Sequence, residues 1–474
     1  MTLDRPYFLC GIGGSGMLPL ALILHGRGAA VSGSDRALDQ GRMPEKFDFL
    51  RAQGIRLFPQ DGSGVSDPKA LVVASAAVED TIPDIAKARA IGAELMLRAQ
   101  LLADLFNASA QSIGVAGTSG KSTTTGMIGW ILSALGSDPT VMNGAVMKNF
   151  ATPDRAFASA LVGKSDLFVS EVDESDGSIA RYAPHVAVVN NISLDHKTMD
   201  ELRKLFSDFA AKAKIAVLNL DSAETAALAA RLPPEKTLTY SLSDAAADFV
   251  AADIAPRPDG VTFNMRAEGR IFTVRLQVPG RHNVSNALAA LAAVSVVGVP
   301  PADAVAAIAR FSGIRRRLEV VGSTKGVTVI DDFAHNPDKI AATLATLHDF
   351  PGRLLIMFQP QGFGPLRLMK NEFIRCFADN LSEDDVLIMP EPVYFGGTTD
   401  RSISSGAIVD GVKAAGRKAF AFADRTECGA NLLDLAKDGD RIVVMGARDD
   451  TLSVFAGELL AALSAGAGKA EPLR

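Results

Sequence analysis

The segment Gly117-Thr-Ser-Gly-Lys-Ser122 carries the strongest chemical signal in the sequence. Backbone amides of such a loop bind phosphate oxygens, the lysine ammonium reaches the terminal phosphates, and the hydroxyl faces Mg²⁺. The strict phosphate-loop pattern needs glycine at position 115, where Val115 stands, so the match is to a shorter variant. We therefore expect an ATP site made by Gly117, Thr118, Ser119, Gly120, Lys121, Ser122 and Thr123.

A second glycine-rich loop, Gly11-Ile-Gly-Gly-Ser-Gly16, follows the pattern G-x-G-x-x-G between a predicted strand and a predicted helix. Glycines let the backbone approach a diphosphate, and an acid after the next strand can bind a ribose hydroxyl. The loop leaves open whether that diphosphate belongs to NAD or to a UDP-sugar, and a tight turn without ligand is the plain alternative. The expected ligand residues are Gly11, Gly13, Gly14, Ser15, Gly16, Ser34 and Asp35.

Acidic residues gather in Ser170-Glu-Val-Asp-Glu-Ser-Asp176, directly after a predicted strand. Mg²⁺ prefers a few carboxylates, with phosphates and water completing its shell, so Glu171 is the first ligand candidate. A solvated acidic turn is the plain alternative. Asp195 and His196 end another predicted strand, where a lone histidine is more often structural than a ligand.

Together, these segments resemble those of the Mur ligases, ATP-dependent amide-forming enzymes of peptidoglycan synthesis. Six motifs occur in family order over nearly the whole chain. They are the Gly117–Ser122 loop, Glu171-Val-Asp-Glu-Ser-Asp, Asp195-His196, His282-Asn-Val-Ser-Asn286, Gly313-Ile-Arg-Arg-Arg317 and Asp331-Asp-Phe-Ala-His-Asn336.

The resemblance implies roles for further residues. Lys121, Glu171, His196 and Arg317 would be catalytic, and Ser122, Glu171 and His196 would hold Mg²⁺. The ATP site would also include Asn283, Asn286, Arg317 and Asp332, and the amine side would include His335, Asn336 and Arg367. The family transfers the γ-phosphoryl group of ATP to a carboxylate, and an amine then attacks the acyl phosphate. Both steps gather negative charge, so cations and donors carry the catalysis.

The N-terminal loop is most similar to that of members joining UDP-N-acetylmuramate to L-alanine, and also to that of members recycling murein tripeptide. This favours a UDP-muramyl-type sugar nucleotide over NAD, with a small amino acid or peptide as the amine. The chain departs from the family pattern at Ser119, Ser122 and Lys197, and at Gln359-Pro-Gln-Gly-Phe-Gly-Pro-Leu-Arg367, where Gln-Pro-His-Arg-Tyr is expected. Another substrate pair, or a non-catalytic nucleotide-binding paralog, is therefore an alternative.

The elements that must position these loops are predicted as strands alternating with helices, which is typical of parallel α/β sheets. We predict a Rossmann-like UDP-sugar-binding domain at 1–110 and a central ATP-binding domain of phosphate-loop ATPase type, with a mixed sheet, at 111–313. A Rossmann-like amino-acid-binding domain is predicted at 314–474. The predicted hinge, Gly313 to Arg317, would let this last domain close.

Composition excludes several other classes of protein. Among 474 residues, 48% are hydrophobic and 22% charged, which is an ordinary globular balance rather than a disordered one. The net charge of −6 argues against a protein built to bind nucleic acid. Three separated cysteines form no disulfide framework. Without a signal peptide or a long apolar stretch, we expect a cytoplasmic monomer or homodimer without membrane insertion.

Overall fold

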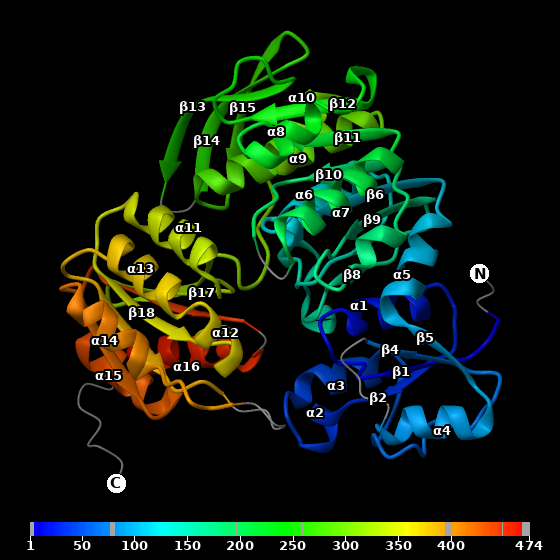
Figure 1. Ribbon diagram of the computed structural model, residues 1–474, viewed down its shortest axis with the longest axis horizontal. Coiled ribbons are helices and arrows are strands. Elements are labelled where there is room, and N and C mark those ends of the chain that lie inside the picture. The colour runs from blue at the N-terminus through cyan, green and yellow to red at the C-terminus, as the bar shows by residue number, and fades with distance from the viewer. Residues whose placement is uncertain are drawn as a thin grey trace. The chain divides into compact units, whose positions relative to one another are not determined.

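The computed structural model describes residues 4–75, 81–194, 197–257, 260–393, 400–447 and 449–466, and these fall into two compact units, Met1–Ile314 and Arg315–Arg474. Strands and helices alternate along both units (Figure 1). None of the described helices is long and apolar enough to cross a membrane.

In the described part of residues 4–110, the first unit begins with a five-stranded parallel sheet of order β3-β2-β1-β4-β5. Successive strands are added on one side of β1 as β2 and β3 and on the other side as β4 and β5, so the strand order reverses between β1 and β4. In open α/β sheets, ligands bind outside the carboxyl ends of the strands at this position. The strands are β1 (Tyr7–Cys10), β2 (Val31–Ser34), β3 (Arg56–Phe58), β4 (Leu71–Ala74) and β5 (Glu94–Leu97). The helices are α1 (Met17–Gly26), α2 (Arg36–Asp39), α3 (Pro44–Ala52), α4 (Pro83–Ile91) and α5 (Arg98–Asn107).

Described residues from 111 onward add a ten-stranded mixed sheet of order β15-β14-β13-β12-β11-β10-β6-β9-β7-β8. Its parallel centre places the carboxyl ends of β10, β6 and β9 next to one another. These strands are β6 (Gln111–Ala116), β7 (Thr140–Met142), β8 (Ala160–Leu161), β9 (Leu167–Glu171), β10 (Val186–Val189), β11 (Ile215–Asn219) and β12 (Thr237–Ser241). The antiparallel pairs of this mixed sheet include those of β13 (Phe249–Arg257), β14 (Gly260–Ala267) and β15 (Arg270–Leu276).

Helices cover both faces of this second sheet. Small and apolar residues of α6 (Lys121–Ala134) and α9 (Arg281–Val296) share one core with α10 (Pro301–Ile308). On the other face lies α7 (Met199–Lys212), which begins with a capping box between Thr198 and Glu201. Shorter elements are α8 (Ala223–Ala229), η1 (Lys148–Phe150), η2 (Pro153–Arg155), η3 (Ser178–Arg181) and η4 (Pro234–Lys236).

The two sheets of the first unit share a hydrophobic core, so the residues predicted as the first two domains pack as one body. Phe106 of α5 is fully buried, and its ring centroid lies 5.8 Å from that of Phe168 on β9 and 5.1 Å from that of Tyr182. Edge-to-face aromatic pairs of this kind add to the burial of apolar surface. Helix α5 therefore packs against both sheets and joins their hydrophobic cores.

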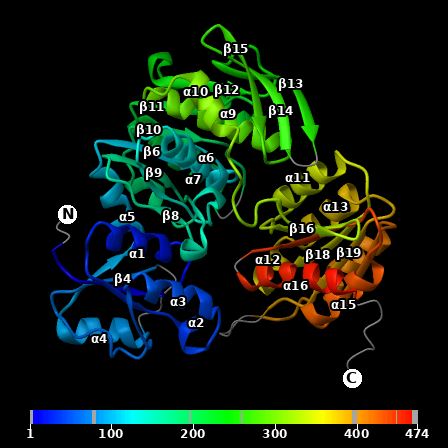
Figure 2. The same cartoon turned by 180° about the vertical axis from the view of Figure 1, so that it is seen from behind.

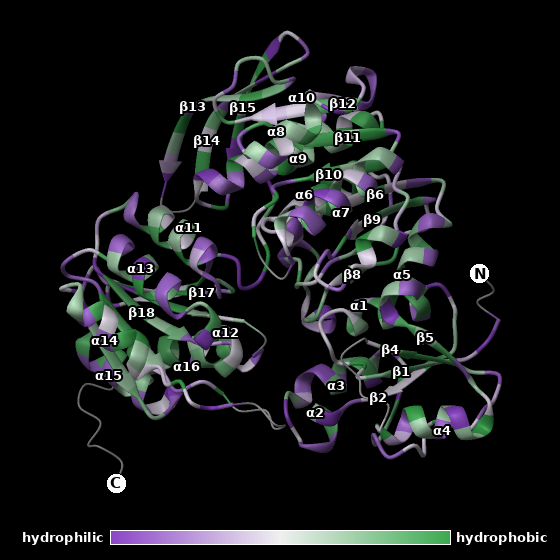
Figure 3. Ribbon diagram, in the orientation of Figure 1, coloured by the Kyte–Doolittle hydropathy of each residue, from purple (hydrophilic) through white to green (hydrophobic). Residues whose placement is uncertain are grey.

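Described residues of the second unit form a six-stranded sheet of order β16-β17-β21-β18-β19-β20, parallel except for β16. Alternate residues of β18 belong to opposite cores, one under α11, α13 and α14 and one under α15 and α16. Figure 2 shows α16 in front of the sheet, and Figure 3 shows both hydrophilic and hydrophobic residues along α4 and α13, as expected for helices covering one face.

The strands of the second unit are β16 (Glu319–Thr324), β17 (Val327–Asp332), β18 (Leu354–Gln359), β19 (Val386–Pro390), β20 (Lys418–Phe422) and β21 (Arg441–Gly446). The helices are α11 (Pro337–His348), α12 (Phe363–Leu368), α13 (Lys370–Asn380), α14 (Gly406–Ala414), α15 (Arg425–Leu435) and α16 (Thr451–Ala465).

Truncation of the shared aromatic core should destabilise the whole first unit. We expect Phe106→Ala to lower the free energy of unfolding by about 3–5 kcal/mol, because it leaves a cavity among buried rings. The chain has a single tryptophan, Trp130 on α6, whose fluorescence during urea unfolding reports on this unit. The control is Ile271→Ala, at a side chain that is 73% exposed. Equal, small shifts for both variants would contradict the shared core.

Candidate active site

The loop between β6 and α6, residues Gly117 to Ser122, needs glycine at two positions. Gly117 has φ +136° and Gly120 has φ +82°, a backbone region that favours glycine. Space is restricted as well, because a Cβ on Gly120 would lie 2.8 Å from Asn190 Nδ2. The amides of Gly120 to Thr123 donate no hydrogen bond within the described residues. Such amides at the start of a helix are suited to bind an anion.

Two adjacent asparagines after β10 hold this loop in shape. Asn191 Oδ1 accepts hydrogen bonds from the Ser119 amide and the Thr118 hydroxyl, both at 2.8 Å. Asn190 Nδ2 donates to Thr124 Oγ1 at 3.0 Å. Sequence reasoning placed only Asp195 and His196 in this stretch, and both lie outside the described residues. The missed signal was a polar pair directly at the end of a fully buried strand.

The start of α9 reaches the same loop, so the structure brings Asn283 and Asn286 to the predicted ATP site. Asn286 Oδ1 accepts from Thr124 Oγ1 at 3.3 Å, and Asn286 Nδ2 donates to Asn283 Oδ1 at 3.0 Å. Asn283 Nδ2 in turn donates to the Pro279 carbonyl at 2.7 Å. Both asparagines are more than nine-tenths buried, and their polar atoms are satisfied by this chain of bonds.

Lys121 lies at the centre of the loop and is surrounded by acceptors. Its Nζ donates to the Gly117 carbonyl at 2.7 Å and pairs with Glu174 Oε2 at 3.0 Å. Burial alone would lower the pKa of this ammonium, but nearby carboxylates, Glu174 foremost, raise the pKa of Lys121 above its usual value. Burial also raises the pKa of Glu174. The lysine is therefore charged at neutral pH and ready to bind phosphate oxygens.

Glu171 and Ser122 form a pair of oxygen donors beside the lysine. Glu171 Oε2 accepts from Ser122 Oγ and from the Gly144 amide, each at 3.0 Å. A hydroxyl and a carboxylate side by side at a phosphate loop fit the oxygen ligands that Mg²⁺ prefers, with phosphates and water filling other positions. Among the described residues, no group of three His, Cys, Asp or Glu side chains could hold a metal without such help.

The first glycine loop follows β1 and is fixed by two charged side chains. Asp35 accepts hydrogen bonds from the Gly13 amide and the Ala37 amide, both at 2.8 Å, so each of its carboxylate oxygens is bonded to a backbone amide. Lys46 of α3 is 8% exposed and donates to the Gly13 carbonyl at 3.2 Å. The amides of Ser15 and Gly16 donate no hydrogen bond within the part of the chain that the structure describes. The loop is therefore rigid, with two amides available to a ligand.

Ser34, predicted at the same ligand, is fully buried below the loop. Its hydroxyl donates to Asp84 Oδ2 at 2.5 Å, and its carbonyl accepts from the amides of Gly11 and Ile12 at 2.8 and 2.9 Å. Asp84 also accepts from the Gly62 amide at 2.9 Å, and burial raises the pKa of its carboxyl group. In this structure Ser34 supports the loop from within the sheet.

In the second unit, the predicted residues lie near the carboxyl end of β17. Arg317 stacks over the ring of Phe333, with 4.4 Å from its Cζ to the centroid. Asp332 accepts from the Leu318 amide at 3.2 Å and from the Thr343 hydroxyl. His335 Nδ1 lies 2.9 Å from the Phe333 carbonyl, and Asn336 caps α11 through the Lys339 amide at 3.0 Å.

Arg367 lies on the short helix α12 and pairs with Asp400 at 2.5 Å. Both side chains of this pair are largely exposed. Within the described residues, no hydrogen bond or ion pair joins Arg367 to His335 or Asn336, the other residues predicted for the amine side.

Comparison with known proteins places these features in a family. Residues 7–110 match the model "Mur ligase family, catalytic domain", 115–294 the Mur ligase middle domain and 316–448 the "Mur ligase, glutamate ligase domain". The UDP-N-acetylmuramate–L-alanine ligase of Agrobacterium fabrum is 34% identical over 97% of each chain. That of Streptomyces coelicolor is 35% identical over 95% of this chain and 96% of the relative. The chain belongs to the Mur ligase family.

Solved structures agree with this Mur ligase fold. The UDP-N-acetylmuramate-alanine ligase of Thermotoga maritima superposes with a TM-score of 0.79 at 24% identity, over 98% of this chain and all of that one. A murein peptide ligase of Psychrobacter arcticus gives a TM-score of 0.71 at 24% identity, with the same coverage. The predicted family, three-domain α/β fold and class of enzyme, an ATP-dependent ligase, are confirmed. Membership of a ligase family gives no support to NAD as the ligand of the first glycine loop, the alternative that its sequence pattern left open.

Loss of the Lys121 ammonium should abolish ATP turnover by this Mur ligase. We expect Lys121→Ala to lower kcat at least about 100-fold, because an oriented cation at the transferred phosphate is worth that much or more. The measurement is phosphate release from ATP. The control is Lys204→Ala, which removes a 76% exposed lysine of α7. Turnover near that of the unchanged enzyme would show that the ATP site lies elsewhere.

Neutralising Glu171 should reduce catalysis without unfolding the Mur ligase. Glu171→Gln keeps the side-chain shape and removes the charge, so we expect a large fall in kcat, a higher Mg²⁺ requirement and an unchanged Tm. Glu235→Gln, at an exposed position in η4, is the matched control. If the variant works normally at low Mg²⁺, Glu171 is not a metal ligand.

Proposed function

We propose that this Mur ligase joins the carboxylate of UDP-N-acetylmuramate to the amino group of L-alanine, with ATP converted to ADP and phosphate. The observation that carries the proposal is the similarity, over 97% of each chain, to a relative that bears the name of this activity. Further support comes from the two glycine loops of the first unit, whose amides are available to phosphates. One loop would bind ATP and the other would bind the sugar nucleotide. The product supplies a precursor for peptidoglycan.

The reaction passes through an acyl phosphate. The substrate carboxylate attacks the γ-phosphorus, the bond to the β,γ-bridging oxygen breaks, and ADP leaves. The amine then attacks the activated carbonyl carbon and phosphate leaves as the amide forms. Lys121 would stabilise the oxygens of the phosphoryl group in transit, with Arg317 joining it as the family resemblance implies, and binding three substrates in line would supply most of the remaining acceleration.

Ser122 and Glu171 are the residues that would hold Mg²⁺, joined by His196 according to the family resemblance. When bound, the ion supplies positive charge that neutralises the transferred phosphoryl group. Thr118, Ser119 and Thr123 complete the phosphate loop, and Asn283 and Asn286 at the start of α9 would lie at the adenine end, as the family resemblance implies.

The first glycine loop, Gly11 to Gly16, would bind the diphosphate and uridine of the sugar nucleotide within domain 1–110. Asp35 keeps the loop in shape through the Gly13 amide and would lie next to the nucleoside. Domain 111–313 would bind ATP. A ligand at both loops would place the muramyl carboxylate between them.

Domain 314–474 would supply the amine side through His335, Asn336 and Arg367, with Asp332 and Arg317 at the nucleotide. The boundary between the two compact units falls after Ile314, inside the predicted hinge, where Gly313 has φ +97°. This supports closure of the C-terminal domain by rotation about 313–317.

A different amine is the second candidate, because the stretch after β18 departs from the family pattern. Gln359 is buried and its Nε2 donates to Asp449 Oδ2 at 2.9 Å, an oxygen that also meets Arg425 NH1 at 3.3 Å. This polar cluster stands at the carboxyl ends of β18 and β21, where parallel sheets bind ligands. It supports recognition of a zwitterionic amine without the usual histidine and arginine.

The test is a substrate panel. With UDP-N-acetylmuramate and L-alanine, we expect one phosphate per amide product, identified by mass spectrometry. Glycine and L-serine should be poorer substrates, because a single methyl or hydroxyl changes binding by about 1–3 kcal/mol. Product only with another amino acid, or only with a preformed peptide such as murein tripeptide, would reject L-alanine and leave the ligase chemistry intact. No product with any pair would reject the proposed function.

A further inference from the structure

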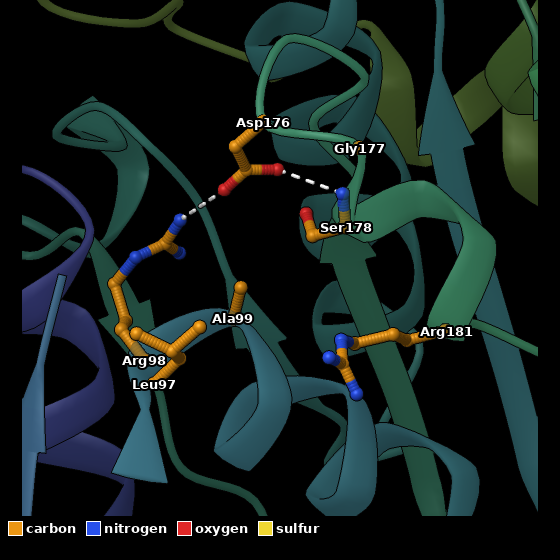
Figure 4. Close-up of a pocket in the computed structure, with 7 residues that line it drawn as sticks. All are labelled: Leu97, Arg98, Ala99, Asp176, Gly177, Ser178 and Arg181. Carbon is orange, nitrogen blue, oxygen red and sulfur yellow. Dashed lines mark hydrogen bonds and ion pairs between the residues drawn. The ribbon is translucent and has the colours of Figure 1, made fainter. Parts of the chain in front are cut away.

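A pocket lies in the first unit where the start of α5 faces the turn before η3 (Figure 4). Arg98, the first residue of α5, points across it toward Asp176, and their NH2 and Oδ2 atoms are 3.4 Å apart. The other carboxylate oxygen of Asp176 accepts from the Ser178 amide at 2.8 Å. The pocket is lined by Leu97, Arg98, Ala99, Asp176, Gly177, Ser178 and Arg181.

Arg98 also lies against the first glycine loop. A Cβ on Gly16 would stand 3.1 Å from Cδ, Nε and NH1 of Arg98, so the guanidinium lies directly over that glycine. The amides of Ser15 and Gly16, which make no hydrogen bond within the described residues, belong to the same short segment. A guanidinium beside such amides is the arrangement that binds phosphate oxygens in two places at once.

The turn that holds Asp176 connects the two nucleotide loops. Glu174 pairs with Lys121 of the second loop, and Asp176, two residues later, pairs with Arg98 at the first. The turn is stiff, because the Gly177 amide donates to the Glu174 carbonyl at 3.1 Å and the Ile179 amide to the Asp173 carbonyl at 3.2 Å. Asp176 therefore stays in place whether or not Arg98 is bound to it.

We infer that Arg98 binds the diphosphate of the sugar nucleotide at the first glycine loop, and that it leaves Asp176 to do so. The inference rests on the proposed function of that loop. The Arg98–Asp176 distance of 3.4 Å is longer than the 2.7–2.9 Å of a strong charge-assisted bond, so the carboxylate is a weak competitor. A diphosphate carries more negative charge than the single carboxylate of Asp176, and pairs of its oxygens can accept two hydrogen bonds from the planar guanidinium.

The partner carboxylate gives the inference its test, because loss of the arginine should weaken binding whereas loss of the aspartate should not. Binding of UDP-N-acetylmuramate and of UDP is measured by calorimetry, with ATP binding and Tm recorded for each variant. Arg98→Gln should weaken binding of both uridine ligands at least about tenfold and leave ATP binding unchanged. Asp176→Asn should leave that affinity unchanged or increase it, because the guanidinium no longer exchanges partners.

The control is Arg203→Gln, which removes the same charge from a half-exposed arginine of α7 that pairs with Asp200 and Glu224, and which should change neither affinity. Arg98→Lys should fall between Arg98→Gln and the unchanged protein. If the unchanged protein binds the uridine ligands and Arg98→Gln binds them equally well, the inference is wrong and the proposed function stands. Parallel losses in Arg98→Gln and Asp176→Asn would also overturn it, because the ion pair would then be structural. Failure of the unchanged protein to bind either ligand would reject the proposed function itself.

Discussion

The ammonium of Lys121, enclosed between the Gly117 carbonyl and the Glu174 carboxylate, is the interaction on which the first unit depends. A partly buried cation is stabilised where acceptors surround it, and here those acceptors come from the loop and from the turn that follows β9. The arrangement keeps a full positive charge at the start of α6, beside amides that also favour anions.

Several separate features follow from that constraint. The left-handed glycines give the loop its curvature, and the asparagines after β10 bond the loop at Ser119 and the first turn of α6 at Thr124. Glu171, at the end of β9 on the opposite side of β6, holds the hydroxyl of Ser122. The parallel order β10-β6-β9 is what brings all of these groups to one edge.

Local signals in the sequence were sufficient to predict both glycine loops, because a short segment between a strand and a helix defines its own chemistry. The same is true of Glu171 and of the alternation of strands and helices. Asn190 and Glu174 could not be found in that way, because their contacts depend on which strands are neighbours, and strand order is not written in any single segment. Arg98 could not be found either, because its contact with Asp176 joins segments that follow strands of two different sheets. Asp35 shows the limit of a local signal. Its type and position in the sequence indicate a ribose contact, whereas in the folded chain both of its carboxylate oxygens accept hydrogen bonds from backbone amides.

The aromatic contact of Phe106 with Phe168 and Tyr182 also bears on how this chain exchanges parts with its relatives. A recombinant protein could join the first 110 residues of one family member to the rest of another. The side chains on the two sides of this contact must then fit in size and shape, because a mismatch leaves a void in a close-packed interior. A crossover after Ile314 divides two units that each have their own cores. Modular replacement is therefore easier for the part proposed to select the amine than for the part proposed to bind the sugar nucleotide.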